Sequence, residues 1–357
     1  MEIFNLNNFL ESGIFITSPI ENKIWCVYDS ITKHSDSENL EYPYFYFNDF
    51  YFSRQKCFYK GKKFFEFTTK YFLEIISDYN DNSPKINWDC FLQDNYENQF
   101  RYIKNLISDS SINKGVPFSS LIGKAEINNE NKIYLLKNLI NKSLNYNTYV
   151  YGFWDEKEGF IGATPELVFK QNKKLVHTIA LAGTIKNDKN VNKEVFSKDP
   201  KILNEHNYVI EGINKSLASF GHLKMSPTMV FELPHLLHLK TDIILHLFSQ
   251  FEFLSLLKCL HPTPAVGIYP SNSQFWQEEQ KLNSKYRKLF AAPFGVLLNK
   301  NDSLCVCLIR GMQWNRTDIQ ITAGGGVVKE SDFLNELDEI LSKINSIIKN
   351  LGLSHEF

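Results

Sequence analysis

The chain has 357 residues, and its 39 Lys and Arg against 40 Asp and Glu give a formal net charge of −1. This balance lacks the basic excess that is typical of nucleic-acid-binding proteins, so we expect no nucleic-acid partner. The sequence has no apolar run of the roughly 18–20 residues that span a bilayer, and the segment Met1–Asn5 does not resemble a secretory signal, which together predict a cytoplasmic protein without membrane contact.

The first 95 residues predict strands rich in aromatic side chains. Residues 42–47 and 63–67 have the composition of such strands. The polar cluster at residues 78–84 is typical of a turn, and it is the best candidate for a loop boundary. It is too short to predict a linker between independent domains.

From residue 96 onward, the apolar spacing changes repeatedly between the periods of helices and of strands. Helices are predicted over residues 96–112, 132–144 and 200–217 and after Ser331-Asp332. Strands are predicted over residues 118–122, 149–154, 159–162, 167–169, 175–178, 289–297, 304–309 and 318–322. Asp199-Pro200 supplies a capping residue and a first-turn proline for the helix over 200–217. Because these elements mix without a regular βαβ order, we predict an α+β fold.

A glycine run followed by an acidic helix face is the clearest functional signal. Ala323–Val328 contains three glycines after a predicted strand, where a ligand can approach the backbone closely. Glu336, Glu339 and Lys343 follow at positions i, i+3 and i+7, so they share one face of the last helix. Two carboxylates and an ammonium on one face can hold a cation beside an anionic substrate. A solvated face with salt bridges is the alternative interpretation.

Three other segments carry chemically useful side chains. They are Glu205-His206 in the helix after Asp199, Glu166 after a proline, and the stiff loop 260–267 with two prolines. Taken alone, each has an ordinary structural explanation. His235 and His238 lack a third ligand at metal spacing, so we interpret them as ordinary helix or loop residues.

Taken in order, these segments resemble the chorismate-binding enzymes. That family includes isochorismate synthase, salicylate synthase, and the first components of anthranilate synthase and aminodeoxychorismate synthase. The matching stretches, spread over about half of the chain, are GATPELVF (162–169), ALAGT (180–184), DPK…EH (199–206), HLKT (238–241), LHPTPAVG (260–267), FAAPFG (290–295), the strand ending in Arg310, and AGGGVVKESD…E..E…K (323–343).

The resemblance implies a role for each matching residue. Glu205 and Glu339 match magnesium ligands, with Glu336 beside the metal, so Mg²⁺ is the expected cofactor. Glu166 matches the general acid that protonates the departing C4 hydroxyl of chorismate. Residues that bind the substrate carboxylates or line the ring match Ala182, Gly183, Thr184, His261, Ala265, Phe290, Arg310, Gly324, Gly326 and Lys343.

The fold that the resemblance implies is the α+β chorismate-binding fold of anthranilate synthase component I. In it, two antiparallel sheets pack face to face, helices lie outside, and the site lies in a cleft. Residues 1–95 are expected to add strands to this core, and residues 96–357 to form the catalytic region. A monomer is expected.

The motifs favour the isochorismate synthase branch of the family. Glu205-His206 and ALAGT stand where anthranilate and aminodeoxychorismate synthases typically carry an aspartate-rich helix motif and a PxGT loop. HPTPA is typical of the isochorismate branch, and Ala265 and Phe290 match isochorismate synthases rather than salicylate synthases. The expected activity is therefore an isomerase reaction, the magnesium-dependent conversion of chorismate to isochorismate, for menaquinone or siderophore biosynthesis.

Two departures from the family pattern leave alternatives open. The position of the general-base lysine holds Ser119, whose hydroxyl is too weak a base, and Lys124 is an odd number of residues further along the strand. Ile202 replaces an acid three residues before Glu205, which predicts weaker magnesium binding. The chain could therefore be a slow isochorismate synthase, an enzyme forming salicylate or an amino-substituted product, or a homologue that binds chorismate-like ligands without turnover.

Overall fold

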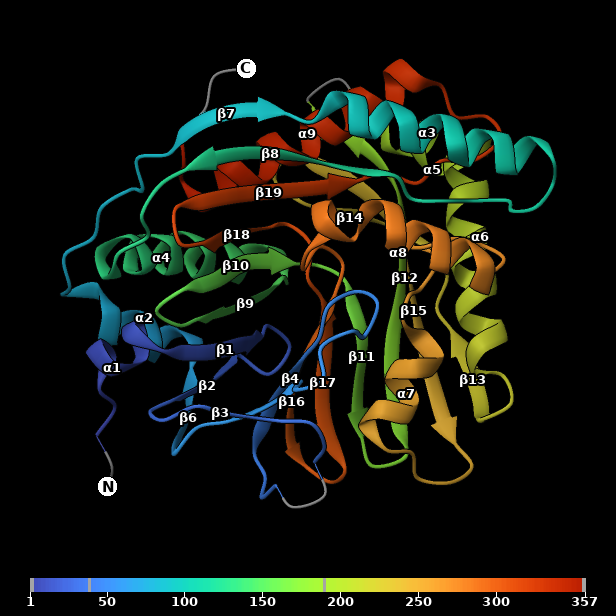
Figure 1. The fold of residues 1–357 in the computed structure, drawn as a ribbon. Helices are drawn as coiled ribbons and strands as arrows, with labels where there is room; N and C mark the ends of the chain where they lie inside the picture. Colours follow the sequence, from blue (N-terminus) through green and yellow to red (C-terminus); the bar gives the residue numbers. More distant parts are fainter. Residues whose placement is uncertain (1–2, 38–39, 189–190, 355–357) are drawn as a thin grey trace.

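The computed structural model describes residues 3–37, 40–188 and 191–354. Residues 1 and 2 of the segment Met1–Asn5 lie outside the described residues. Two large antiparallel sheets form the centre, and helices lie on their outer faces (Figure 1). The predicted α+β fold with two packed antiparallel sheets is confirmed.

The first sheet has nine strands among the described residues, in the order β6-β2-β1-β9-β10-β18-β19-β8-β7. Their bounds in that order are Lys63–Thr68, Lys23–Tyr28, Gly13–Ser18, Tyr149–Trp154, Glu158–Thr164, Gly311–Asn315, Asp318–Gly324, Phe118–Lys124 and Asn87–Phe91. Strands from the first 95 residues thus stand at both edges of this sheet.

The second sheet has ten strands among the described residues, and nine of them follow the order β13-β15-β12-β11-β17-β16-β4-β5-β3, while β14 also pairs with β15. Their bounds are Gly221–Met225, Leu236–Leu247, Leu175–Lys186, Leu167–Asn172, Asp302–Cys307, Pro293–Asn299, Tyr44–Phe47, Phe58–Lys60 and Thr32–His34, with β14 at Met229–Glu232. The chain crosses between the sheets near residue 165 and near residue 310, where β10 passes to β11 and β17 to β18.

The described helices are α1 (Leu6–Glu11), α2 (Thr69–Ser77), α3 (Gln93–Ser108), α4 (Asn129–Tyr146), α5 (Lys193–Lys198), α6 (Pro200–Leu217), α7 (Phe253–Leu260), α8 (Ser273–Arg287) and α9 (Phe333–Leu351). Apolar side chains of α1 to α4 and α9 pack on the outer face of the first sheet. Those of α6 and α7 pack on the outer face of the second. Within the described parts of the chain, no helix combines the length and apolar character that a membrane span needs.

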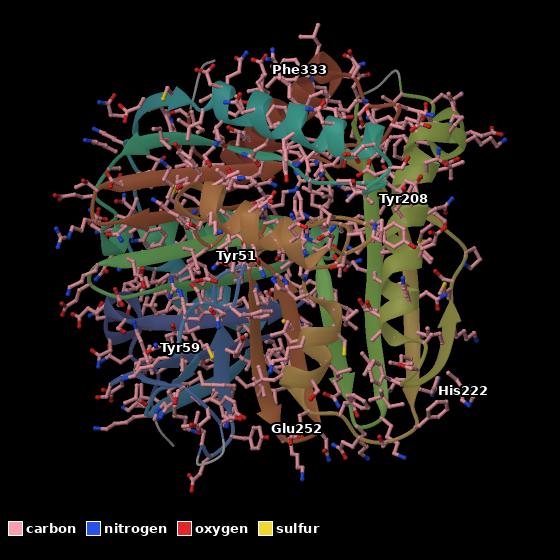
Figure 2. The ribbon with its side chains drawn as sticks, turned by 45° about the vertical axis from the view of Figure 1, so that its right-hand side comes forward. Tyr51, Tyr59, Tyr208, His222, Glu252 and Phe333 are labelled. Atoms are coloured by element: carbon pink, nitrogen blue, oxygen red, sulfur yellow. The ribbon has the colours of Figure 1, made fainter. Side chains whose placement is uncertain are left out.

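Apolar side chains of both sheets fill the space between them. Successive side chains of β4 point to opposite faces of the second sheet, so this short strand contributes to two hydrophobic clusters. Phe45 and Phe47 face the first sheet, and Tyr44 and Tyr46 face the outer helices. Tyr59, labelled in Figure 2, stacks on Phe47 with ring centroids 3.9 Å apart. Aromatic burial of this kind stabilises the sheet packing that positions the crossovers.

Local sequence signals explain both helices that carry acidic residues. Asp199 caps α6 by accepting a hydrogen bond from Ile202 N at 3.1 Å, and Pro200 occupies the first turn, as predicted. Asp332 caps α9 by accepting from Leu334 N at 3.1 Å. Helix α9 ends at Gly352, whose φ of 73° is left-handed.

One predicted strand begins later than expected. Residues 289–297 were expected to be extended, but β16 begins only at Pro293. Lys288 and Ala291 have φ values of 47° and 62°, and Phe290 N donates to Arg287 O at 2.8 Å. Tight turns therefore occupy the segment that the apolar pattern assigned to the strand.

Candidate active site

A buried cavity lies at the crossovers between the two sheets, and side chains from both sheets, α6 and α9 line it. Residues predicted for the site make up more than half of its lining. They are Glu166, Ala182, Thr184, Glu205, Ala265, Phe290, Arg310, Gly324, Gly326 and Lys343. Segments that are more than 150 residues apart in the sequence thus line the same cavity.

Glu166 enters the cavity from the crossover between β10 and β11. Its backbone N–H donates to Thr164 Oγ1 at 3.0 Å, which fixes the turn after Pro165. The side chain is only 5% exposed, and burial raises its pKa to about 8, against the opposing effect of Lys114, Arg310 and Lys343. Glu166 therefore carries a proton at neutral pH, the state that a general acid needs.

Arg310 enters from the other crossover, between β17 and β18. Its φ of 61° is left-handed, a conformation that costs free energy and turns the chain sharply. Burial lowers its pKa to about 10, so the guanidinium remains charged at neutral pH. Nη1 of this buried side chain has no hydrogen-bond partner within the described structure. A charged and partly unpaired guanidinium in a cavity suits a carboxylate ligand.

His238 holds Arg310 in place. Its Nε2 lies 3.3 Å from Arg310 Nη2, and its Nδ1 lies 3.0 Å from Thr184 Oγ1. Burial and the charges of Arg310 and Lys343 keep the pKa of His238 well below its ordinary value, so the ring is neutral. In the tautomer that satisfies both contacts, Nε2 accepts from Arg310 and Nδ1 donates to Thr184. The prediction that His238 is an ordinary helix or loop residue is wrong, because it belongs to β15 and lines the cavity.

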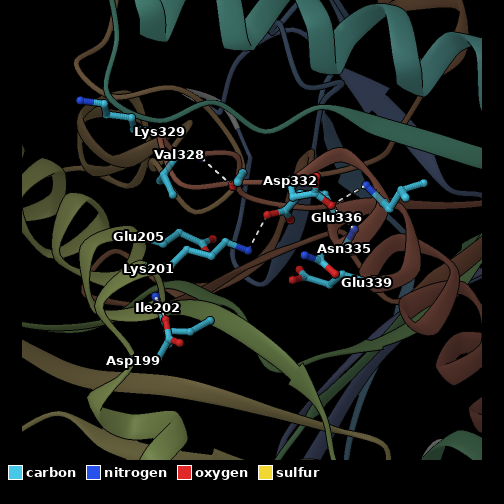
Figure 3. Close-up of polar contacts among 12 residues, drawn as sticks. Asp199, Lys201, Ile202, Glu205, Val328, Lys329, Asp332, Asn335, Glu336 and Glu339 are labelled. Carbon is cyan, nitrogen blue, oxygen red and sulfur yellow. Dashed lines mark hydrogen bonds and ion pairs between the residues drawn. The ribbon is translucent and has the colours of Figure 1, made fainter.

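Three acidic side chains meet at the glycine run after β19. A β-carbon at Gly326 would overlap Glu205 Oε1, so only glycine leaves room there. A β-carbon at Gly325 would lie 3.5 Å from Glu339 Oε1 and 3.7 Å from Glu336 Oε2. Figure 3 shows Glu205 on α6 opposite Glu336 and Glu339 on α9. The two helices thus bring their carboxylates to the same short backbone segment.

Each of these carboxylates has a lysine partner. Lys114 Nζ lies 3.8 Å from Glu205 Oε1, Lys201 Nζ lies 2.5 Å from Glu336 Oε1, and Lys343 Nζ lies 2.6 Å from Glu339 Oε1. Burial raises the pKa of Glu205 to about 7 and also raises the pKa of Glu336. The lysines offset the repulsion between these neighbouring carboxylates when the carboxylates are charged.

The donor set suits a hard cation. No three ligating side chains among the described residues stand close enough to form a ready-made metal cage. Magnesium does not need one, because it usually binds through one or two carboxylates and keeps several waters. The carboxylate oxygens of Glu205 and Glu339, on facing helices, are of the kind that Mg²⁺ prefers, so these two residues could hold it.

Two predicted substrate-binding residues lie outside the lining. His261 Nε2 lies 2.9 Å from Phe50 O, and its ring packs against those of Phe50 and Phe52. Gly183 lies in the lining strand β12, but its φ is 70° and a β-carbon there would lie 2.7 Å from Ile202 Cγ2. It provides close contact between β12 and α6 rather than a wall of the cavity.

The two departures from the family pattern also point away from the cavity. Ile202 packs in an apolar cluster with Phe196, Leu237 and Leu239. Ser119 Oγ donates to Leu92 O at 2.7 Å, on the face of β8 that is opposite to Phe118 and Ser120. Phe118 contacts the lining residue Phe290, and Ser120 bonds the lining residue Thr322. The cavity side of β8 therefore carries no basic side chain at these positions.

Lys114, which contacts Glu205, is a residue near the site that sequence reasoning missed. It is fully buried, and burial lowers its pKa while Glu205 raises it. No motif or periodicity marks this position, because Lys114 lies between α3 and β8 and reaches the site only through long-range backbone pairing with Tyr269. Val116, two residues further on, does line the cavity and was missed for the same reason.

A family model described as chorismate binding enzyme matches residues 78–352. Isochorismate synthase MenF of Bacillus subtilis is 27% identical over 213 residues, which cover 57% of this chain and 45% of that protein. MenF of Escherichia coli is 30% identical over 211 residues, covering 57% of this chain and 48% of that protein. The chain thus spans about half the length of these curated relatives.

Solved structures show the fold over nearly the whole chain. A Bacillus anthracis protein assigned as a 2,3-dihydroxybenzoate-specific isochorismate synthase, DhbC, has a TM-score of 0.80 at 22% identity, and 98% of each chain is covered. Anthranilate synthase component I of Streptococcus pneumoniae has a TM-score of 0.67 at 15% identity, covering 97% of this chain and 86% of that one.

Proposed function

The chain belongs to the chorismate-binding enzyme family, and we propose that it converts chorismate to isochorismate. The observation that carries this proposal is Glu166, a buried carboxyl with a pKa of about 8 in the same cavity as Arg310 and Lys343. A protonated acid beside two cations fits a substrate with two carboxylates and a hydroxyl leaving group. The product would enter menaquinone or siderophore biosynthesis.

In the proposed reaction, the oxygen of a water bonds to C2 of the ring, the double bonds shift, and the C4–O bond breaks. The attacking water releases one proton to solvent, and the C4 hydroxyl takes up one proton and departs as water. Glu166 gives its proton to the departing oxygen, since hydroxide is a poor leaving group. Arg310, held by His238, binds one substrate carboxylate through its fork of N–H donors. Lys343, whose Nζ donates to Gly324 O at 2.8 Å, stands beside the second anionic group.

We further propose that Glu205 and Glu339 hold Mg²⁺, with Glu336 nearby. When bound, the ion would neutralise and orient a substrate carboxylate. The surrounding carboxylates keep this part of the cavity polar, while Phe290 and Ala265 provide an apolar wall for the ring. Substrate position is thereby set from both sides.

A second candidate is favoured by the cavity face of β8. Phe118 and Ser120 occupy it, and neither accepts a proton from an attacking water at neutral pH. Ammonia needs less help from a base than water does. An amino-substituted product is therefore the alternative, and binding without turnover is the limiting case.

Product analysis tests these proposals. Purified protein, chorismate and Mg²⁺ are incubated and the products are separated by liquid chromatography, with a parallel reaction that contains ammonium. Isochorismate in both reactions supports the first proposal. Salicylate, an amino-substituted product only with ammonium, or unchanged chorismate would each reject it, and the Glu166→Gln variant is the control for non-enzymatic conversion.

A further inference from the structure

Backbone hydrogen bonds hold Lys114 in place although it lies outside the named helices and strands. Its backbone N–H donates to Tyr269 O at 3.1 Å, and Tyr269 N donates to Lys114 O at 2.9 Å. The next residue, Gly115, exchanges two backbone hydrogen bonds with Val327, at 3.0 and 2.8 Å. The segment is thus joined to both the glycine run and the loop around residue 269, and the side chain of Lys114 is fully buried.

The side chain of Lys114 occupies space that a β-carbon at Gly326 would partly fill. Nζ donates to Pro264 O at 2.5 Å and lies 3.8 Å from Glu205 Oε1. A β-carbon at Gly326 would lie 2.9 Å from Lys114 Cε as well as overlapping Glu205. The absence of a side chain at Gly326 therefore admits this lysine and this glutamate together.

The three lysines of the acidic cluster differ in their access to water. The side chain of Lys201 is 25% exposed and that of Lys343 is 10% exposed, whereas that of Lys114 is 0% exposed. Lys201 therefore borders solvent while it contacts Glu336. Lys114 has no such access, because its head group is enclosed between Glu205 and the Pro264 carbonyl.

We propose that Lys114 is a fixed counter-cation of Glu205 that weakens the binding of a divalent cation at this carboxylate. The proposal rests on the proposed function, since it assumes that Glu205 is a magnesium ligand. An ammonium that cannot leave repels an incoming Mg²⁺ and competes for the same oxygen. Lys114 is thus a positioning residue, and it sets how much Mg²⁺ the empty cavity can hold without the anionic substrate.

Magnesium binding to the full chain tests this without using turnover. Isothermal titration with MgCl₂ compares the native chain with Lys114→Gln, which keeps a donor for Pro264 O but removes the charge. We expect at least tenfold tighter Mg²⁺ binding in the variant. Lys124→Gln, at an exposed position on β8, is the matched control and should leave the affinity unchanged.

The outcomes are separable from those of the chorismate assay. An unchanged or weaker Mg²⁺ affinity in Lys114→Gln, or no Mg²⁺ binding to either protein, would overturn the proposal even if isochorismate were formed. Tighter binding would support it even if chorismate remained unchanged. If Lys114→Gln did not fold, Lys114→Met would be titrated in the same way, and circular dichroism would establish that the variant is folded.

Discussion

Arg310 lies in the crossover between the two sheets and His238 in β15 of the second sheet, and Nη2 of the arginine lies 3.3 Å from Nε2 of the histidine. The neutral imidazole gives the guanidinium an acceptor without neutralising its charge. Thr184 in turn fixes the imidazole. This chain of contacts fixes the orientation in which the guanidinium faces the cavity.

Replacing Arg310 by lysine should therefore raise KM for chorismate roughly 10–100-fold, because an ammonium cannot keep both the imidazole contact and a two-pronged carboxylate contact. The effect on kcat should be smaller. Steady-state kinetics measure both. Arg316→Lys is a matched control, since Arg316 is exposed and also has a left-handed φ. Equal KM values for the native chain and Arg310→Lys would contradict the assignment.

Replacing Glu166 by glutamine should lower kcat about 10²–10⁴-fold, since the amide cannot protonate the departing hydroxyl. In the native chain, the acid must be protonated to act. Its pKa of about 8 predicts that kcat/KM falls as the pH rises above about 8. A pH–rate profile measures this decline, and a profile that is flat to pH 10 would argue against Glu166 as the acid.

The same group makes stability depend on pH. The pKa of Glu166 is 4.5 in the reference state and about 8 in the fold. The folded chain therefore holds more protons between these values, and its stability falls as the pH rises through this window. Glu166→Gln has no carboxyl to titrate and so avoids this loss. The gain in its free energy of unfolding relative to the native chain should be small at pH 5 and reach at most about 5 kcal/mol above pH 8.

Urea unfolding at several pH values measures that difference. Glu156→Gln, at an exposed position in the turn before β10, is the control and should show no pH-dependent gain. A constant offset between native and Glu166→Gln chains from pH 5 to pH 9 would show that the buried carboxyl does not titrate as stated.

Ser119 should matter little for turnover. Its hydroxyl bonds Leu92 O on the face of β8 that is turned from the cavity. We expect Ser119→Ala to keep the rate within a few-fold, and Ser119→Lys to bring no gain. Initial rates at saturating chorismate measure both. A large increase in Ser119→Lys would mean that the register of β8 differs from the one described.

The buried pair Arg287–Glu279 should be important for stability. Arg287 Nη2 donates to Glu279 Oε1 at 2.7 Å, and the guanidinium lies between the rings of Phe50 and Phe118, 3.9 and 4.3 Å from their centroids. Tyr51, labelled in Figure 2, also donates to Glu279. Arg287→Met leaves a buried carboxylate without its cation, which should cost about 3–5 kcal/mol of unfolding free energy.

The double variant Arg287→Met/Glu279→Gln should recover part of this loss, since no charge remains unpaired. Urea unfolding of the native chain, both single variants and the double variant forms the cycle. A loss below 1 kcal/mol in Arg287→Met would show that Glu279 has found another partner or water.

Local signals predicted the parts of the site that depend on one element. Asp199 and Pro200 placed the start of α6, and the spacing of Glu336, Glu339 and Lys343 placed three groups on one face of α9. These features depend on helical periodicity and capping, which a single segment contains.

Features that depend on pairing between distant strands could not be predicted in this way. The side of β8 on which Ser119 lies follows from its register with β19, where Ser119 pairs with Ala323. A slip of one residue would exchange the two faces. His238 reaches Thr184 across an irregular register between Ala182 and Thr184. The place of Lys114 likewise depends on a backbone bridge to Tyr269, and no residue near Lys114 in the sequence predicts that bridge.

Helix α9 supplies Glu336, Glu339 and Lys343, while its apolar face covers the first sheet together with α4. During synthesis on the ribosome, a nascent chain that ends before this helix would already contain Glu166, Glu205 and Arg310 but would lack Glu336, Glu339 and Lys343. The acidic cluster and the hydrophobic core would then be completed in the same late step of folding.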